Sequence, residues 1–395
     1  MRVLFPALLF VCFLFASCDK ERISIRQSES FVKFYGDKMD DIGMQVIAAK
    51  DGSFIIMGNI ATPNRGKDIC FIHTDAYGNS IAPVKVYGSL FDDNGYAIRK
   101  TSKGYIIAGS TEQSNGGKKD ILLVQVDEQG NELKSSIIGT NGNDEAFDIQ
   151  VLSNGNYILT GYTDSIEARK KEMMLAQTNP DGDLLSMNLI GYKEDDEVGN
   201  SIIADDSTTY YIAGYTKSRP SGTTRSNVFI VRWNVKGTGL GTAIPLINES
   251  NGNSSAASII SDNSGNFIIS CNIQPLQQTN SNIKLIKIDK DLNVIWQNDT
   301  YNDGQNDFVS NTYIFNNKIY IVGTSGTANE FGNILLVEIQ KDGSNPVFYH
   351  AGDGSSYSGR SLDFTSDGGY IITGANKTNE SSVITLIKLN SGYKL

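Results

Sequence analysis

The sequence predicts an all-β protein, because one short strand motif recurs along the whole chain. The motif reads GYIIAGST from Gly104 to Thr111, an apolar run closed by glycine and small polar residues. Its seven copies place the closing residue at Gly58, Gly109, Gly161, Gly214, Cys271, Gly323 and Gly374. These positions are 51 to 57 residues apart. Such a period is typical of repeat architectures, in which each unit buries its apolar faces against its neighbours.

Each repeat also contains three other strand-like segments. In one repeat these are GYAIRKT at 95–101 before the motif, DILLVQVD at 120–127 after it, and SSIIG at 135–139 beyond the turn DEQGN. Four short strands joined by turn residues form one antiparallel sheet, and radial repetition of such sheets is a β-propeller. We therefore predict a seven-bladed β-propeller with four antiparallel strands per blade.

The two ends of the chain are expected to complete one blade together. The last repeat stops after its third strand, Val383–Asn390. Near the other end, SFVKFYG at Ser30–Gly36 closely matches VKVYG at Val84–Gly88, and its glycine lies one repeat period earlier. We expect the N-terminal strand to pair with the C-terminal blade and close the ring, which removes open sheet edges.

The N-terminal segment predicts export and a lipid anchor. Met1 and Arg2 precede the apolar run VLFPALLFVCFLFA, which is typical of a secretory signal peptide. The run ends in FASC, which resembles the lipobox of bacterial lipoproteins and implies that Cys18 becomes the lipidated first residue. The alternative is a plain signal peptide with an incidental cysteine. We expect a signal peptide at 1–17, a tether at 18–29 and the propeller at 30–395.

The repeat pattern, with GGYIITG, DILLVQVD and a closing Tyr-Gly, resembles the propeller repeats of secreted proteins and lipoproteins of bacteria, in particular Bacteroidetes. The resemblance covers nearly the whole chain after the tether. It implies a protein of the cell envelope, held at the outer membrane by its lipid alone, on either the periplasmic or the surface side. Propellers have many roles, so the resemblance implies a fold and not an activity.

The composition disfavours several functions. The formal net charge of −10 disfavours nucleic acid, which needs a basic surface. The two histidines, His73 and His350, are expected to be solvated, because nothing in the sequence pairs them with a nucleophile or a metal-ligand cluster. Cys70 and Cys271 belong to repeats four apart, so we expect buried thiols and no disulfide. We expect no metal ion and no cofactor.

Acidic residues recur just before the first strand of several repeats. They could surround one mouth of the channel and attract a cation. A residue that recurs in blade after blade usually has a structural role, however, and here we favour turn hydrogen bonding. The residues are Asp40, Asp41, Asp92, Asp93, Asp144, Glu145, Asp195, Asp196 and Asp307.

The first strands are expected to line a wet central channel with small and polar side chains, among them Gln45, Asp148 and Asp363. Asp148 with Asp363 could be a carboxylate pair for glycoside hydrolysis. This gives the alternative function, a carbohydrate-active enzyme (a glycoside hydrolase or lyase) that uses channel carboxylates.

The loops between second and third strands are long and variable, and such loops on a rigid scaffold are where binding usually resides. Two of them contain a candidate basic patch of Arg169, Lys170, Lys171, Arg219 and Arg225. Basic side chains on an acidic protein could bind an acidic glycan or a carboxylate-rich protein. We therefore predict a monomeric, lipid-anchored propeller that acts as a non-catalytic module for binding or scaffolding an envelope protein or a glycan.

Overall fold

The computed structural model describes residues 30–392 apart from 38, 64, 113–117, 166–169, 192–194, 207, 218–224, 235–241, 246–251, 276–279, 299–300, 302, 327–330, 355 and 379–380. Every regular element within these residues is a β-strand, and every strand pair is antiparallel, so the all-β prediction is confirmed. None of the described residues forms a helix that is long and apolar enough to cross a bilayer.

Five sheets contain four strands each, hydrogen-bonded in chain order. The first sheet comprises β2 (Ile42–Ala48), β3 (Phe54–Thr62), β4 (Gly66–Thr74) and β5 (Lys85–Tyr87). The second comprises β6 (Asp93–Lys100), β7 (Tyr105–Glu112), β8 (Lys119–Val126) and β9 (Glu132–Ile138). The third comprises β10 (Asp144–Val151), β11 (Tyr157–Thr163), β12 (Glu172–Thr178) and β13 (Leu184–Ile190). The fourth comprises β14 (Glu197–Ala204), β15 (Thr209–Thr216), β16 (Asn227–Asn234) and β17 (Thr242–Pro245). The fifth comprises β18 (Gly252–Ser261), β19 (Phe267–Pro275), β20 (Asn282–Ile288) and β21 (Val294–Gln297).

The remaining strands form one eight-stranded sheet made of two four-stranded halves. One half comprises β22 (Asp307–Phe315), β23 (Lys318–Gly326), β24 (Gly332–Gln340) and β25 (Val347–Ala351). The other comprises β26 (Tyr357–Phe364), β27 (Tyr370–Thr378), β28 (Ser381–Leu389) and β1 (Phe31–Tyr35). A single residue pair, Gly332 with Tyr357, joins the halves. Strand β1 lies antiparallel to β28, from Phe31 opposite Lys388 to Tyr35 opposite Ile384.

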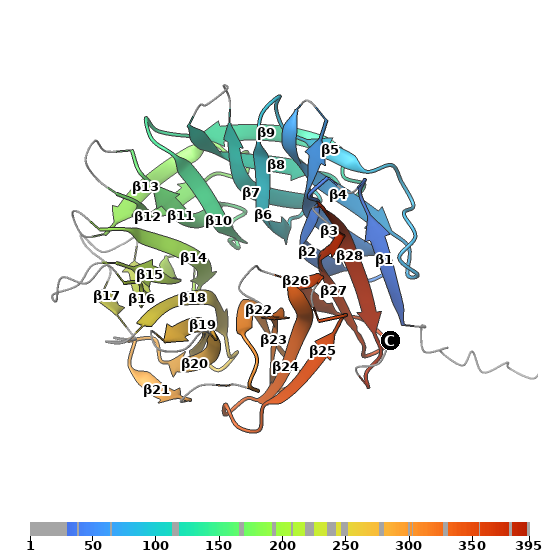
Figure 1. The fold of residues 1–395 in the computed structure, drawn as a ribbon. Coiled ribbons are helices and arrows are strands. Elements are labelled where there is room, and N and C mark those ends of the chain that lie inside the picture. The colour runs from blue at the N-terminus through green and yellow to red at the C-terminus, as the bar shows by residue number, and fades with distance from the viewer. Residues whose placement is uncertain are drawn as a thin grey trace, which may run out of the picture.

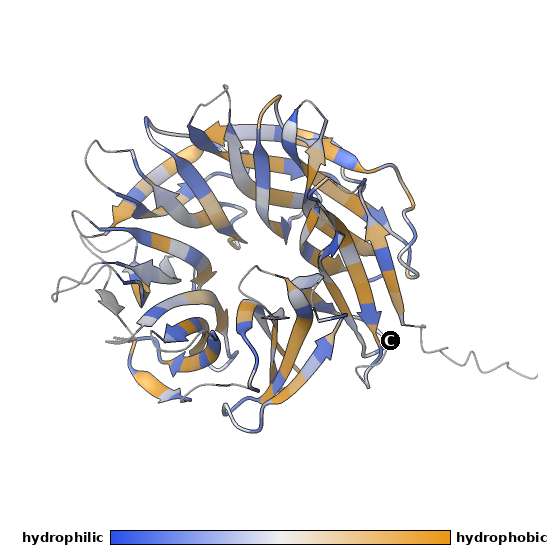
Figure 2. Cartoon of the chain, viewed as in Figure 1, coloured by the Kyte–Doolittle hydropathy of each residue, from blue (hydrophilic) through white to orange (hydrophobic). Residues whose placement is uncertain are grey.

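The sheets are arranged radially around one axis, with the first strand of each innermost, which is the arrangement of a β-propeller (Figure 1). Hydrophobic residues alternate with hydrophilic ones along many strands (Figure 2). The second and third strands are buried on both faces, as in β11, where every residue is buried. Seven clusters of buried apolar side chains each combine residues of two neighbouring four-stranded units.

The recurring glycine has a steric cause. Gly109 on β7 lies opposite Gly95 of β6, where the first strand has an irregularity between Gly95 and Ala97. A Cβ at Gly109 would lie 1.8 Å from the Asn94 carbonyl oxygen, so only glycine fits without moving the backbone. A close approach of the neighbouring strand's backbone therefore requires glycine at this position.

Both cysteines of the described chain are buried free thiols, as expected. Burial raises the pKa of Cys70 to about 12. Burial also raises the pKa of Cys271 above its usual range. Both groups therefore stay protonated and behave as small apolar side chains.

Strand β1 contacts two units besides pairing with β28. Phe31 and Tyr35 pack against the cluster that joins β3 and β4 to β27 and β28, and Val32 packs against the cluster of β23, β24 and β27. The Tyr35 hydroxyl donates a hydrogen bond to the Gly78 carbonyl at 2.6 Å. The N-terminal strand thus binds the last unit to the turn after β4.

We predict that a chain starting at Asp37 is less stable than one starting at Ser30. It loses the β1 ladder and three apolar side chains, so we expect the free energy of unfolding to fall by about 3 kcal/mol or more, since burying one such side chain contributes about 1.5–3 kcal/mol. Thermal and urea unfolding measure this change. Phe34, which is 51% exposed, provides the control: Phe34→Ser should leave the midpoint unchanged whereas Val32→Ser lowers it. Equal midpoints for the two truncated chains would contradict the stabilising role of β1.

Candidate functional site

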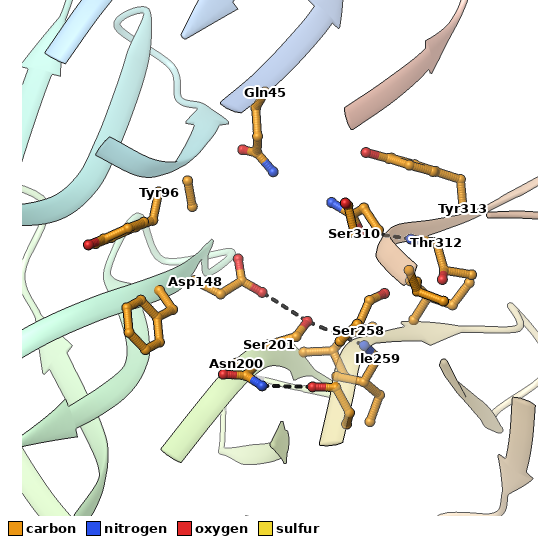
Figure 3. A pocket seen from close by; sticks show the side chains of 18 of the residues that line it. Gln45, Tyr96, Asp148, Asn200, Ser201, Ser258, Ile259, Ser310, Thr312 and Tyr313 are labelled. Carbon is orange, nitrogen blue, oxygen red and sulfur yellow. Dashed lines mark hydrogen bonds between the residues drawn. The ribbon is translucent and has the colours of Figure 1, made fainter. Parts of the chain in front are cut away.

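A cavity of about 610 Å³ lies at the axis, where the innermost strands face one another. It is lined by residues of β2, β6, β10, β14, β18, β22 and β26. Gln45, Asp148, Ser310 and Tyr313 surround a common space in Figure 3. Gln45 and Asp148 both line this cavity. The lining is mainly hydroxyl and amide side chains with a few aromatic rings.

Several inward side chains connect one innermost strand to the next. Asp148 Oδ2 accepts hydrogen bonds from the Ile202 amide at 3.0 Å and the Ser201 hydroxyl at 3.1 Å. Ser201 Oγ in turn accepts from the Ile259 amide at 3.3 Å. Figure 3 shows this relay between β10, β14 and β18. These polar side chains therefore satisfy backbone groups of the ring as well as lining the cavity.

Gln45 has the same linking role on the opposite side of the cavity. Its Oε1 accepts from the Ile98 amide at 2.7 Å and from Arg99 Nη1 at 3.0 Å. Arg99 Nη2 then lies 2.5 Å from Asp148 Oδ1, in an ion pair whose side chains are 26% and 9% exposed. The charged residues of the lining are Arg99, Asp148 and Arg360. Although the chain is acidic, the lining therefore has two guanidinium groups and one carboxylate.

Asp363 lies in a different, smaller cavity of about 210 Å³, which shares Gln45, Arg99 and Tyr313 with the first. Its Oδ2 accepts from the Ala48 amide and its Oδ1 from the Phe364 amide, both at 2.8 Å. Burial raises the pKa of Asp363, and the two backbone hydrogen bonds oppose that rise. The structure does not bring Asp148 and Asp363 into one cavity, and each is held by backbone amides.

A buried carboxylate, Glu145, lies beside the cavity. The sequence groups it with the recurring acids, for which turn hydrogen bonding was favoured, but its partners are side chains of other strands. Glu145 accepts hydrogen bonds from Tyr96 Oη at 2.6 Å and Tyr162 Oη at 2.7 Å, and Lys119 Nζ lies 3.3 Å from it. Tyr96 also packs edge-on against Phe147, with ring centroids 5.0 Å apart. Burial alone would raise the pKa of Glu145, but the two tyrosines and Lys119 together hold it below its ordinary value. Tyr96 of the cavity wall is thereby fixed in place.

The proposed basic loop patch is only partly described. Arg169 and Arg219 lie outside the described residues, as does Cys18. Lys170 is exposed and Arg225 is half-buried. Lys171 Nζ lies 3.8 Å above the Tyr162 ring, and the Lys171 amide donates to Asp196 Oδ1 at 3.2 Å. Lys171 therefore packs against its own scaffold.

The recurring acids of the first strands mostly have the turn role expected for them. Asp93 Oδ2 accepts from the Ser89 amide at 2.5 Å, Asp144 Oδ2 from the Thr140 amide at 2.7 Å, and Asp41 Oδ2 from the Asp37 amide at 3.1 Å. All three are fully buried. Asp307 occupies the equivalent position of β22, and its surroundings differ.

Asp307 lies beside Asp303 and His350. Burial, and then the nearby Asp303 carboxylate, raise the pKa of Asp307 to about 6, while the Ser325 hydroxyl acts to lower it. Ser325 and Asp303 lie close to Asp307, but neither makes a hydrogen bond of standard geometry with its oxygens. His350 was expected to be solvated. The residue is exposed, and its Nε2 lies 3.1 Å from Asp303 Oδ2. His73 Nε2 lies 3.2 Å from the Ser53 hydroxyl.

No protein-family model matches the chain, and no curated protein matches it. Several solved structures do match the chain. A protein of unknown function from Dyadobacter fermentans aligns over 92% of this chain and 98% of its own, with 9% identity and a TM-score of 0.52. The polysaccharide lyase Uly1 aligns over 90% and 91%, with 10% identity and a TM-score of 0.52. A fungal alcohol oxidase of the AA5 family, in complex with copper, aligns over 91% and 76%, with 10% identity and a TM-score of 0.54. At such identities the likeness shows the fold alone.

We predict that Glu145→Gln destabilises the protein most at neutral pH. Because the folded-state pKa of Glu145 is depressed, the ionised group stabilises the fold above its ordinary pKa of 4.5, and this contribution is lost as the pH falls through the folded-state value. Hydrogen bonds to charged groups contribute about 1.5–3 kcal/mol, so a loss of this size is expected at pH 7. Urea unfolding from pH 7 down to pH 3 should show the difference from wild type shrinking. Glu132→Gln, at an exposed position of β9, is the control. A difference that stays constant with pH would contradict this interpretation.

Proposed function

We propose that the chain is a seven-bladed propeller that binds a glycan without cleaving it, in the axial cavity, while lipid on Cys18 holds it in the cell envelope. The blade count is supported by five four-stranded sheets and an eight-stranded sheet of two halves. Ring closure is supported by the pairing of β1 with β28 and by the apolar cluster in which Val46 and Ile56 meet Ile371 and Ile384. The propeller would then occupy 30–395, after a signal peptide and a tether.

The chemistry of the cavity lining is the observation on which the glycan proposal rests. Ligand pockets are typically of about 300–1,000 Å³ and contain a few convergent polar groups, and this cavity has that size. Asn200, Asn311 and Gln150 provide amides. Asn200 and Gln150 each donate one hydrogen bond to a backbone carbonyl and Asn311 accepts one from a backbone amide, and the remaining donors and acceptors can bind sugar hydroxyls. Tyr96 and Tyr313 add aromatic rings that can lie against sugar faces.

The charges of the lining favour an acidic glycan. Asp148 is paired with Arg99, so the charges of these two side chains largely compensate each other, and Asp148 also accepts two hydrogen bonds from β14. Arg360, on β26, adds a second guanidinium to the wall. A planar guanidinium suits bidentate recognition of a carboxylate or a sulfate. We therefore infer a uronate-containing or sulfated sugar as the ligand class.

The carbohydrate-active enzyme has less support. A glycosidase needs two carboxyl groups at a set separation across one bond, and the lining of the axial cavity has Asp148 alone. Its proposed partner, Asp363, lies in the smaller cavity and is bound by backbone amides. The fold likeness to a polysaccharide lyase and an alcohol oxidase does not transfer an activity to this chain.

Binding to a uronate tetrasaccharide tests the glycan proposal. We expect calorimetry to detect binding, tighter than to a neutral tetrasaccharide of the same linkage. Arg360→Met and Asn311→Ala should each weaken it about tenfold or more, equivalent to about 1.4 kcal/mol. Lys170→Ala, at an exposed loop position, should change nothing. Absence of binding, or equal affinity in both cavity variants, would reject the proposal. Release of shortened sugars would support the enzyme alternative instead.

The anchor is tested separately. Cells grown with labelled palmitate should incorporate the label into the wild-type protein, and Cys18→Ala should abolish incorporation and move the protein from the membrane to the soluble fraction. Acyl chains attach to the membrane through the burial of their CH₂ groups, at about 0.8 kcal/mol each. Cys12→Ala, in the apolar run, is the control. Label retained in Cys18→Ala would rule out lipidation at this residue.

A further inference from the structure

Three potential metal ligands meet at the junction between the β18–β21 sheet and the β22–β25 half-sheet. Asp303 lies in the link between β21 and β22, Asp307 begins β22, and His350 lies on β25. One ligand atom of each residue lies within 4.8 Å of the others. His350 Nε2 is 3.1 Å from Asp303 Oδ2. His350 and Asp307 lie on the outermost and innermost strands of one half-sheet, and Asp303 lies four residues before Asp307 in the link that enters it.

The Asp307 carboxylate needs a partner that the described residues do not provide. Asp307 is fully buried, and neither of its oxygens has a hydrogen-bond partner among the described residues. Its counterparts Asp41, Asp93 and Asp144 each accept a turn amide. A buried carboxylate without a partner is costly, and a bound cation would compensate that cost.

The repeat itself shows that this junction is unusual. His350 lies opposite Leu335 on β24, which lies opposite the recurring glycine Gly323. The residues at the same register in the other four-stranded units that have one are Val86 on β5, Ile137 on β9, Leu189 on β13, Pro245 on β17 and Phe34 on β1. An imidazole therefore replaces an apolar side chain at the one described junction where the first-strand aspartate lacks a turn partner. The histidine on β25 and the aspartate without a turn partner, two separate departures from the repeat, thus lie close together.

We propose that Asp303, Asp307 and His350 bind a divalent transition-metal cation of the zinc type. An imidazole nitrogen with two carboxylate oxygens is a ligand set that suits Zn²⁺ better than Mg²⁺ or Ca²⁺, which take oxygen ligands. The Gln305 amide donates to Asp303 Oδ1 at 2.9 Å and orients this ligand. The side chains of His350 and Asp303 are 28% and 18% exposed, which leaves a path for entry and room for water.

The role of the site is to tie two neighbouring units together. None of the three residues lines the axial cavity, so the metal would act apart from the glycan site. It would fix the link before β22 to the outer strand β25, and β25 is held to the rest of the sheet through β24 alone. A cation that binds the folded chain and not the unfolded one raises the unfolding temperature.

Zinc titration of the chelator-treated protein, purified without a polyhistidine tag, tests the site. We expect calorimetry to find one Zn²⁺ per chain and the thermal midpoint to rise with zinc. His350→Ala and Asp307→Asn should each weaken Zn²⁺ binding at least tenfold and remove the thermal shift. His73→Ala removes the other histidine, and Asp93→Asn changes the equivalent buried acid; both should bind Zn²⁺ as the wild type does.

The outcomes are decisive in each direction. If Asp307→Asn does not fold, His350→Ala and Asp303→Asn decide, because both residues are partly exposed. Absence of zinc binding by the wild type, or undiminished affinity in His350→Ala, would overturn the proposal. Tighter binding of Ca²⁺ than of Zn²⁺ would overturn the assignment of the metal class. An anomalous signal at the zinc edge between these three side chains in a crystal would support it.

Discussion

Each four-stranded unit is apolar on both faces, and the rest of the structure depends on covering both. The middle strands of a unit, such as β7 and β8, contribute Ile106 and Leu123 to one cluster and Ile107 and Val124 to another. A single unit would expose both of these faces to water, so the units are stable only as neighbours. The cluster that unites β3 and β4 with β27 and β28 extends this requirement to the two ends of the chain.

The same packing of unit on unit determines which polar groups at the axis are available to bind a ligand. The innermost strands converge there, and their backbone amides need acceptors that the next unit provides only through side chains. Asp148 and Gln45 accept from Ile202 and Ile98, and Ser361 Oγ accepts from the Val46 amide. Part of the polar lining thus stabilises the ring. The groups that can recognise a ligand are those that remain, such as the Asn311 amide nitrogen and the rings of the wall.

Features that repeat within one unit could be predicted from the sequence, and features formed between units could not. The motif around Gly109 and the inward positions of Gln45 and Asp148 follow from strand alternation and one recurring steric contact. Alternation also predicts that Asp363 points inward. It does not predict the depth of Asp363 along the axis, and the residue lies in the smaller cavity. The contacts of Glu145 with Tyr96, 49 residues away, depend on the packing of β6 against β10, which no local pattern shows.

Departures from the repeat are therefore more informative about function than the repeat itself. A side chain that recurs, such as the aspartate that begins β2, β6 and β10, has the same turn to stabilise in each unit. A side chain that occurs in only one unit does not stabilise a recurring turn. The free energy that its burial costs must therefore be offset by an interaction at its own junction. The isolated Asp307 carboxylate and the single imidazole at a register of otherwise apolar side chains satisfy this condition together. Since both lie within reach of one ion, a shared cation accounts for the two departures with one cause.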